Sequence, residues 1–286
     1  MDGKAGGSMR VPALGLCALM LAVVPVRAAS RSGPAECHPA AAREDAIDAV
    51  GPRGEIVLAS GARALLGSLG WPDEPEAARA ATDRLLAHRG RPLTVVARGE
   101  PDRWGRARID GTVEDAGTGL DLAGSLIGAG LGLVDAGEGD ALCRPALLAV
   151  EETARNAGLG LWRRPLLDAG DGAALRAAAG RFAVVQGVVR HVGERPARTY
   201  LDFVARGEDG LTVSVSKRTW RRMGEHGLSA QRLRGRMVRV RGVVEIRRGA
   251  MLDVASPDLI EVQEETPPAA SGAGPDRERV LRRRTE

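Results

Sequence analysis

Five short runs rich in β-branched residues, with one basic segment between the third and the fourth, constrain the fold of the second half of the chain. The runs are typical of strands and cover residues 182–189, 199–203, 211–215, 237–246 and 251–254. The basic segment, Lys217-Arg-Thr-Trp-Arg-Arg-Met-Gly, is expected to be helical. The order strand, strand, strand, helix, strand, strand is that of a five-stranded, partly open barrel.

We therefore expect residues 180–263 to form a barrel of the OB-fold type, and this barrel is basic. Residues 180–263 hold 16 Lys and Arg against 9 Asp and Glu, whereas residues 30–179 hold 17 against 22. A cationic surface attracts polyanions, so any nucleic acid or other anionic polymer is expected to bind through residues 180–263. The few aromatic residues of this region are expected mostly in the core, not as exposed stacking surfaces.

The first residues combine a basic start at Arg10, an apolar run and the small-residue sequence Val26-Arg27-Ala28. This pattern predicts a secretory signal peptide over residues 1–29, cleaved at Ala28 or Ala29, and hence a periplasmic or secreted protein. The apolar run is shorter than the roughly 20 residues of a membrane-spanning helix, so we expect no stable membrane anchor.

Export would leave two cysteines, Cys37 and Cys143, in an oxidising compartment. We predict that they form a disulfide. Two separate buried thiols are the alternative, because sequence does not supply the geometry that a disulfide needs.

Residues 50–163 mix strand and helix signals. We expect strands at 55–58, 64–66, 93–97 and 107–113, helices at 75–88 and 146–157, and a short helix running into a strand over 122–134. An N-terminal segment, residues 30–49, precedes this domain. A linker is expected over residues 164–179, and a disordered tail over residues 264–286.

Residues 50–163 resemble the thermonuclease-like (staphylococcal nuclease) family, whose features recur here in the same order. These are a hairpin from Gly54, a strand end at Leu65-Leu-Gly67 followed by Pro72 and acids, a helix from Pro75, the turn Asp102-Arg-Trp-Gly-Arg106, and the segment from Leu148 to Gly158-Leu-Gly-Leu-Trp162. The family's domain is itself an OB-type barrel with helices. The resemblance thus implies a mainly β fold with helices (α+β), built from two five-stranded barrels in tandem.

Family members that cleave nucleic acid hold one calcium ion through two aspartates, polarise water with a glutamate and neutralise the phosphate with two arginines. By this resemblance, Arg106 matches the second arginine and Glu55 stands where the first metal-binding aspartate is found. Asp73 and Glu74, which follow Pro72, are the candidates for the catalytic glutamate. Arg106 has an alternative role as the partner of a carboxylate such as Asp102 or Asp110.

Other positions of the family's pattern carry different residues here. Ala64 falls at the first arginine, and Leu69 or Gly70 at the second aspartate. Arg63 is next to the missing arginine, but alternation along a strand would turn it to the opposite face. Because this chemistry rests on charge compensation, such losses cost orders of magnitude in rate.

We therefore expect an exported thermonuclease-like protein with a degenerate phosphodiesterase site that binds an anionic polymer such as nucleic acid. No cofactor is expected unless the site is active, in which case it needs calcium. The alternatives are an active calcium-dependent nuclease of DNA or RNA and a scaffold or interaction module of the cell envelope.

Overall fold

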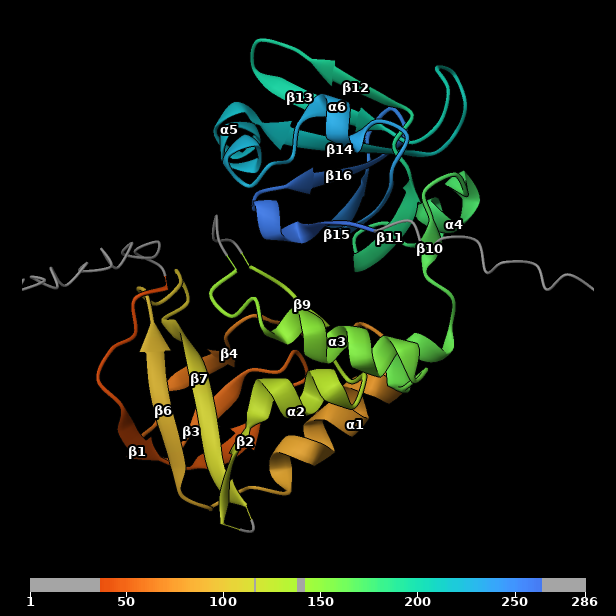
Figure 1. Ribbon diagram of the computed structural model, residues 1–286. Coiled ribbons are helices and arrows are strands. Elements are labelled where there is room, and N and C mark those ends of the chain that lie inside the picture. The colour runs from red at the N-terminus through yellow and green to blue at the C-terminus, as the bar shows by residue number, and fades with distance from the viewer. Residues whose placement is uncertain (1–36, 116, 138–141, 264–286) are drawn as a thin grey trace, which may run out of the picture. The chain divides into compact units, whose positions relative to one another are not determined.

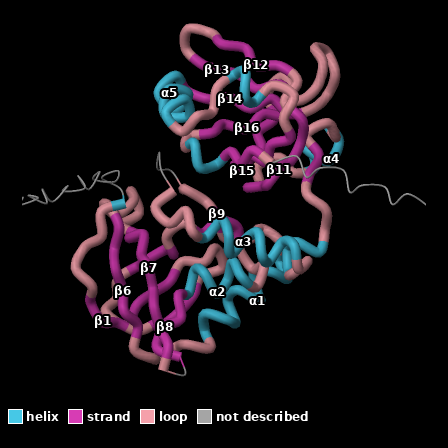
Figure 2. The backbone as a smooth tube through the Cα atoms, in the orientation of Figure 1, coloured by secondary structure: helices cyan, strands magenta, loops and turns pink. Residues whose placement is uncertain are grey.

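The computed structural model describes residues 37–115, 117–137 and 142–263, and its fold is mostly β with a few helices (Figures 1 and 2). The strands form two large sheets with barrel or half-barrel shapes, consistent with OB-like barrels plus helices. The expected signal peptide (1–29), its cleavage at Ala28 or Ala29, and the expected tail (264–286) lie outside the described residues. Within them, no helix has the length and apolar character to span a membrane.

We call the sheet formed by the first strands of the chain the first barrel. Its strands are β1 (Arg43–Asp45), β2 (Ile47–Val50), β3 (Ile56–Leu58), β4 (Arg63–Leu66), β6 (Leu93–Arg98), β7 (Arg106–Asp115) and β8 (Thr118–Asp121). They follow the order β1-β6-β7-β4-β3-β2, with β8 on β7. All neighbours pair antiparallel except β4 and β7, which run parallel with Arg63 opposite Arg106.

Three helices gather on one side of this sheet (Figure 1). They are α1 (Pro75–Leu86), α2 (Leu122–Gly128) and α3 (Leu147–Asn156), accompanied by the short pair β5 (Leu69–Gly70) and β9 (Leu133–Val134) and the 3-10 helix η2 (Gly160–Arg163). Helix α1 begins where the Glu74 side chain accepts the Ala77 amide, and Pro75 supplies a favourable first residue. Its buried residues Ala77, Ala81 and Leu85 repeat every fourth position, so one stripe packs on the core.

The second barrel is formed by the later strands. They are β10 (Leu167–Asp168), β11 (Phe182–Val188), β12 (His191–Glu194), β13 (Arg198–Asp202), β14 (Leu211–Ser216), β15 (Met237–Ile246), β16 (Ala250–Val254) and β17 (Ile260–Val262). Its helical segments are α4 (Gly172–Ala177), α5 (Lys217–Glu225), α6 (Ala230–Leu233) and the 3-10 helix η3 (Pro257–Leu259). The five expected strands and the expected basic helix are all present. The parallel pairing of β14 with β16 joins the two halves of the sheet.

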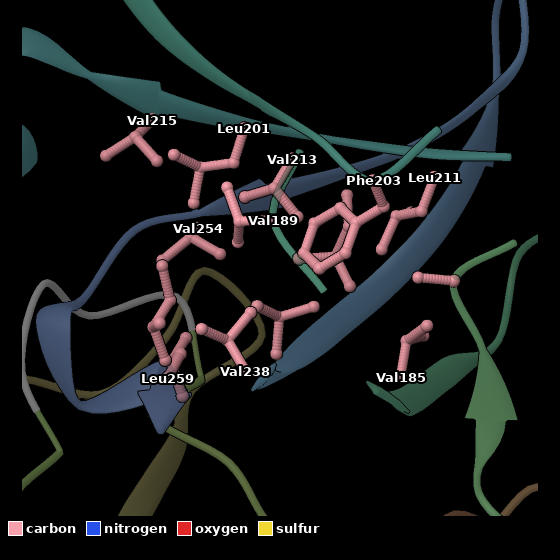
Figure 3. Packing of buried hydrophobic residues seen from close by; sticks show 14 of the residues in the cluster. Val185, Val189, Leu201, Phe203, Leu211, Val213, Val215, Val238, Val254 and Leu259 are labelled. Carbon is pink, nitrogen blue, oxygen red and sulfur yellow. The ribbon is translucent and has the colours of Figure 1, made fainter. Parts of the chain in front are cut away.

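Strand alternation fills the interior of the second barrel with aliphatic side chains. Figure 3 shows labelled residues of β13, β14, β15 and β16 pointing into one shared interior, among them Leu201, Val213, Val238 and Val254. Each of these four is fully buried. Burying one such side chain contributes about 1.5–3 kcal/mol, so this core is the main source of the barrel's stability.

The expected linker at residues 164–179 contains ordered structure. Strand β10 pairs parallel with β11, and Leu175 of α4 and Ala178, the C-cap residue of α4, lie in the core of the second barrel. The glycine and alanine content of this segment suggested a linker, but alanine also favours helix, and one leucine anchors this helix. The packed structure of the second barrel therefore starts before residue 180.

A disulfide joins Cys37 and Cys143, with the two sulfurs 2.02 Å apart. The Cys37 carbonyl also accepts a hydrogen bond of 2.7 Å from Arg98 Nη1, at the end of β6. Arg144, next to Cys143, pairs with Asp121 at the start of α2. The disulfide thus holds the first described residues against the first barrel.

Candidate functional sites

The turn that leads into β7 is organised around one carboxylate, that of Asp102. Its Oδ1 accepts the amides of Trp104 (2.9 Å) and Arg106 (3.0 Å), and its Oδ2 accepts Nε of Arg106 (2.8 Å). The Arg106 guanidinium also lies 4.8 Å from the Trp104 ring centroid. Of the two roles expected for Arg106, the geometry shows pairing with a carboxylate.

Two opposing effects set the pKa of Asp102. Desolvation raises it, but the hydrogen bonds from the Arg106 side chain and from the amides of Arg106 and Trp104 outweigh desolvation. The pKa is therefore lowered to about 2. Asp102 is therefore an anionic partner for Arg106 at pH values above about 2.

Arg63 lies on the same face of the sheet as Arg106 and, as strand alternation predicts, on the face opposite the buried Ala64. In the parallel pairing of β4 with β7, the two arginines are direct neighbours. Glu55 Oε1 accepts Nε of Arg63 (2.8 Å), Oε2 accepts its Nη2 (2.7 Å), and Oε2 lies 3.8 Å from Arg106 Nη1. Ala64, expected at the arginine position, is 0% exposed and belongs to the core.

The two acids expected after Pro72 have other surroundings. Glu74 caps α1, and its Oε1 lies 3.7 Å from Arg164 Nη2. Asp73 is exposed. Within the described residues, neither has a hydrogen bond or ion pair to Glu55 or Arg106, so the structure does not bring the expected catalytic residues together.

The residues of this region do not fit a calcium ion. Calcium takes six to eight oxygen ligands, whereas both oxygens of Glu55 already accept hydrogen bonds from Arg63. Leu69 and Gly70, at the position of the second aspartate, pair with β9 and supply no carboxylate. Across residues 37–115, 117–137 and 142–263, no group of three or more His, Cys, Asp or Glu side chains could hold a metal.

A second candidate site is a hollow of about 1110 Å³ on the second barrel. Outward-facing residues of β12, β13, β14 and β16 line it together with the loops at 203–210 and 247–249. Four exposed arginines surround it: Arg190, Arg195, Arg206 and Arg248. Among the described residues, none of these guanidiniums has a hydrogen-bond or ion-pair partner.

The acidic residues around this hollow each have a partner. Asp202 accepts a hydrogen bond from Thr212 Oγ1 (3.1 Å) and lies 3.3 Å from Nδ1 of His191. Asp209 pairs with Arg176, and Glu208 accepts the Ala205 amide. Of these three acids, Asp209 is paired with an arginine, and the hollow, with four arginines against three acids, keeps a net positive charge.

The charge count of residues 180–263 predicted a cationic surface, but it did not indicate which residues form that surface. A sharper signal was present, because the four arginines of the hollow stand next to strand ends or in the connecting loops. Side chains at such positions gather at the rims and faces of a closed sheet, where ligands bind.

Comparison with known proteins gives little to add to this geometry. No family model matches the sequence, and no curated protein matches it. Among solved structures, the extended Tudor domain of Drosophila melanogaster Tudor-SN (p100) is similar, with 19% identity and a TM-score of 0.30. The match covers 35% of this chain and 47% of that chain, so function has to be argued from the residues themselves.

Proposed function

We propose that this chain is an exported, thermonuclease-like protein without an effective phosphodiesterase site, and that it binds an anionic polymer, foremost nucleic acid, through its second barrel. The observation that carries the proposal is the hollow with four arginines whose guanidiniums have no partner among the described residues. In barrels of the OB-fold type, the face of the second and third strands and the adjoining loops bind oligonucleotides. Here those strands correspond to β13 and β14, and Arg195 and Arg248 belong to the adjoining loops.

The ligand is expected to be held mainly through its backbone charge. Guanidinium groups match phosphate oxygens in a planar, two-donor geometry. Only one aromatic residue, the half-buried Tyr200, faces outward from β13 next to the hollow, between Gly193 and Ser214. Recognition by charge, with little stacking of bases, favours binding of polyanions in general over recognition of a specific base sequence.

The charge state of the first barrel supports a binding role over a catalytic one. Phosphodiester cleavage needs positive groups that are free to compensate the developing charge on phosphate. Arg106 is held by Asp102 and Arg63 by Glu55. A calcium ion, which could supply the missing charge, finds no ligand set in the part of the chain that the structure describes.

Export is part of the proposal on two grounds. The first is the signal-peptide pattern of residues 1–29. The second is the disulfide between Cys37 and Cys143, because such bonds persist mainly in secreted proteins and in the periplasm.

The test is binding of a fluorescent single-stranded oligonucleotide to the purified protein across a range of salt concentrations. The variant Arg206→Ser/Arg248→Ser should bind at least tenfold more weakly. Its slope of log K against log salt should be shallower by about 1.4, since each lost contact to single-stranded phosphate removes about 0.7. The matched control is Arg53→Ser/Arg163→Ser, which removes the same charge from exposed arginines elsewhere.

Equal loss in both double variants would contradict the assignment of the hollow, because the effect would then follow net charge alone. A catalytic assay completes the test. Rapid calcium-dependent cleavage of DNA by the unmodified protein, abolished by Arg106→Ala, would contradict the non-catalytic part of the proposal.

A further inference from the structure

The positive charge of the second barrel is concentrated in one segment of the chain. Residues 180–263 hold 16 Lys and Arg against 9 Asp and Glu, a net charge of +7. Residues 217–236, which include α5 and α6, hold 7 Lys and Arg and a single acid, Glu225, a net charge of +6. We call these residues the α5–α6 segment. The rest of the barrel, the hollow included, is therefore close to neutral in total.

The two helices turn part of this charge toward solvent. Helix α5 buries Thr219 and Met223, four positions apart, so one stripe of the helix packs on the barrel. Arg221 lies outside this stripe and is exposed. Helix α6 is anchored by Leu233, which is 0% exposed, and the next residue, Arg234, is exposed. Among the described residues, the guanidiniums of Arg221 and Arg234 have no hydrogen-bond or ion-pair partner.

The start of α5 is joined to the rim of the hollow. Glu194, the last residue of β12, accepts a hydrogen bond of 3.2 Å from Nε1 of Trp220, and its Oε2 lies 3.4 Å from Nζ of Lys217. Arg195 of the hollow is the next residue of the chain. The negative charge of Glu194, which lies between the two cationic regions, is therefore paired with Lys217.

The end of the α5–α6 segment is joined to the chain before β12. The Gly235 amide donates to the Val189 carbonyl at 2.7 Å, and Val189 directly precedes Arg190 of the hollow. The segment thus contacts the chain at both ends of β12, next to one arginine of the hollow at each end. The hollow and the α5–α6 segment are therefore neighbouring cationic regions of one barrel.

We propose that the α5–α6 segment is a second phosphate-binding surface, and that the ligand is a nucleic acid strand long enough to occupy the hollow and this segment together. The inference rests on the proposed function, because it extends the path of the ligand that the hollow binds. Every nucleotide of such a strand carries a negative charge, so a strand that leaves the hollow presents further phosphates to the neighbouring cationic surface. A short oligonucleotide fills the hollow alone.

A surface in two parts makes binding depend on strand length. Once the hollow holds one part of a strand, binding of the next part to the α5–α6 segment is intramolecular and benefits from a high effective concentration. Each phosphate held there also releases counterions, which adds about 0.7 to the salt slope of a single strand. Affinity and salt slope should therefore both increase with strand length until the segment is covered.

An anionic membrane would also attract the α5–α6 segment by charge. Two observations favour nucleic acid. The segment is joined to the rim of the hollow at both ends of β12. Helix α5 turns its buried stripe, Thr219 and Met223, toward the barrel, so this stripe is not available for insertion into a bilayer.

The experiment compares binding of fluorescent single-stranded oligonucleotides of about 5 and about 16 nucleotides, which cover the range of site sizes in OB-type barrels. The full-length variant Arg221→Ser/Arg234→Ser should bind the longer strand at least fivefold more weakly than the unmodified protein does. Its salt slope for that strand should be shallower by about 1.4, and its affinity for the shorter strand should be unchanged. The matched control, Arg53→Ser/Arg163→Ser, removes the same charge from exposed arginines of the first barrel and should bind both strands normally.

The hollow variant Arg206→Ser/Arg248→Ser separates this inference from the proposed function. Should it bind both strands as the unmodified protein does, the proposed function fails. Should it lose affinity for both strands while Arg221→Ser/Arg234→Ser loses none for the longer one, only the further inference is overturned. A loss in Arg221→Ser/Arg234→Ser that is equal for the two lengths would also overturn it, because the effect would then not depend on reach.

Sedimentation with vesicles of phosphatidylglycerol and phosphatidylcholine tests the membrane alternative. The unmodified protein and Arg221→Ser/Arg234→Ser should sediment to the same extent if the segment serves nucleic acid. A variant that is released from anionic vesicles but binds the longer strand normally would overturn the proposal and assign the segment to a membrane surface.

Discussion

The Asp102 side chain stabilises a turn, orients the Arg106 guanidinium and makes the stability of the fold depend on pH. Its carboxylate closes the turn before β7 and fixes Arg106, which in turn contacts Trp104. The folded-state pKa is about 2, below the roughly 3.9 of an unfolded chain. By linkage, the stabilisation from Asp102 is complete above pH 4 and is lost as the pH falls through about 2.

We therefore expect Asp102→Asn to melt at a lower temperature than the unmodified protein at pH 7, with a difference that shrinks toward pH 2. Thermal melts at pH 7, 5, 3.5 and 2 test this. Asp73→Asn, at an exposed residue without an ion-pair partner among the described residues, is the control and should leave the profile unchanged. A difference that stays constant with pH would contradict the role of charge.

The resemblance placed Arg106 and Glu55 in one cluster, and the structure shows them there with Arg63 as a third member. Arg63 was left out of this cluster because the Leu65-Leu-Gly67 motif placed the arginine position at Ala64. Local sequence could not decide which of the two residues would join the cluster, since alanine and arginine are both tolerated in a strand. The parallel pairing of β4 with β7, which decides which of them joins Arg106, is a contact between residues far apart in the sequence.

At the level of secondary-structure elements, a buried ion pair joins α3 to β15. Arg241 and Glu151 are both 0% exposed, and Arg241 Nη1 donates to Glu151 Oε2 at 2.7 Å. Glu151 Oε1 accepts the amide of Val134 in β9, also at 2.7 Å. Removing one partner of such a pair typically costs about 3–5 kcal/mol, because the other charge is left buried without compensation.

Arg241→Met should accordingly lower the free energy of unfolding by about 3–5 kcal/mol. Arg241→Met/Glu151→Gln should recover a large part of this loss, since glutamine still accepts the Val134 amide but carries no charge. Urea unfolding measures both variants. If the double variant is as unstable as the single one, the loss of stability comes from packing and not from an unpaired charge.

The long strands and the helices were predictable because the signal for each lies within its own sequence: β-branched residues for a strand, and helix-forming residues with a favourable first turn for a helix. The short elements β10, β12 and β17 were not, because a run of two to four residues has too few positions to show alternation. Strand β15 was expected from its valines, but the burial of two of its charged residues, Arg239 and Arg241, was not. Their pairing with Glu261 and Glu151 offsets the cost of burying these charges, and pairing across distant segments leaves no local signature.

At the level of the whole molecule, the disulfide links residues separated by 106 positions. In the chain-entropy model, a loop of this length contributes roughly 4–5 kcal/mol by restricting the unfolded state. We expect Cys37→Ser/Cys143→Ser to lose stability of this order in urea unfolding, with the spectrum of the folded state unchanged.

The same bond has a direct chemical check. The protein purified after export, unfolded without reductant, should release no titratable thiol from either cysteine. Two free thiols per chain would contradict the bond, and with it one of the two grounds for export.

Large-scale organisation was predictable in outline. Strand order and the family resemblance indicated two OB-like barrels, and the described structure is consistent with that coarse arrangement. The boundary between the two barrels was not predictable, because α4 has the amino-acid composition of a linker. This helix is ordered because Leu175 packs into a core that is formed mostly by later strands.

The parallel pairing of β14 with β16 also has a consequence for the order of events during synthesis. Residues 211–215 pair with β13 on one side, but on the other side their partners are residues 250–254, so the second barrel stays open until that part of the chain has been made. The first barrel needs nothing beyond β8 to complete its sheet. Domains generally fold as units from the N-terminus during synthesis, and unpaired strands are vulnerable to aggregation. A ribosome or export channel that releases the chain gradually would therefore leave one edge of β14 unpaired until β16 emerges, and we expect a chaperone to bind at that edge.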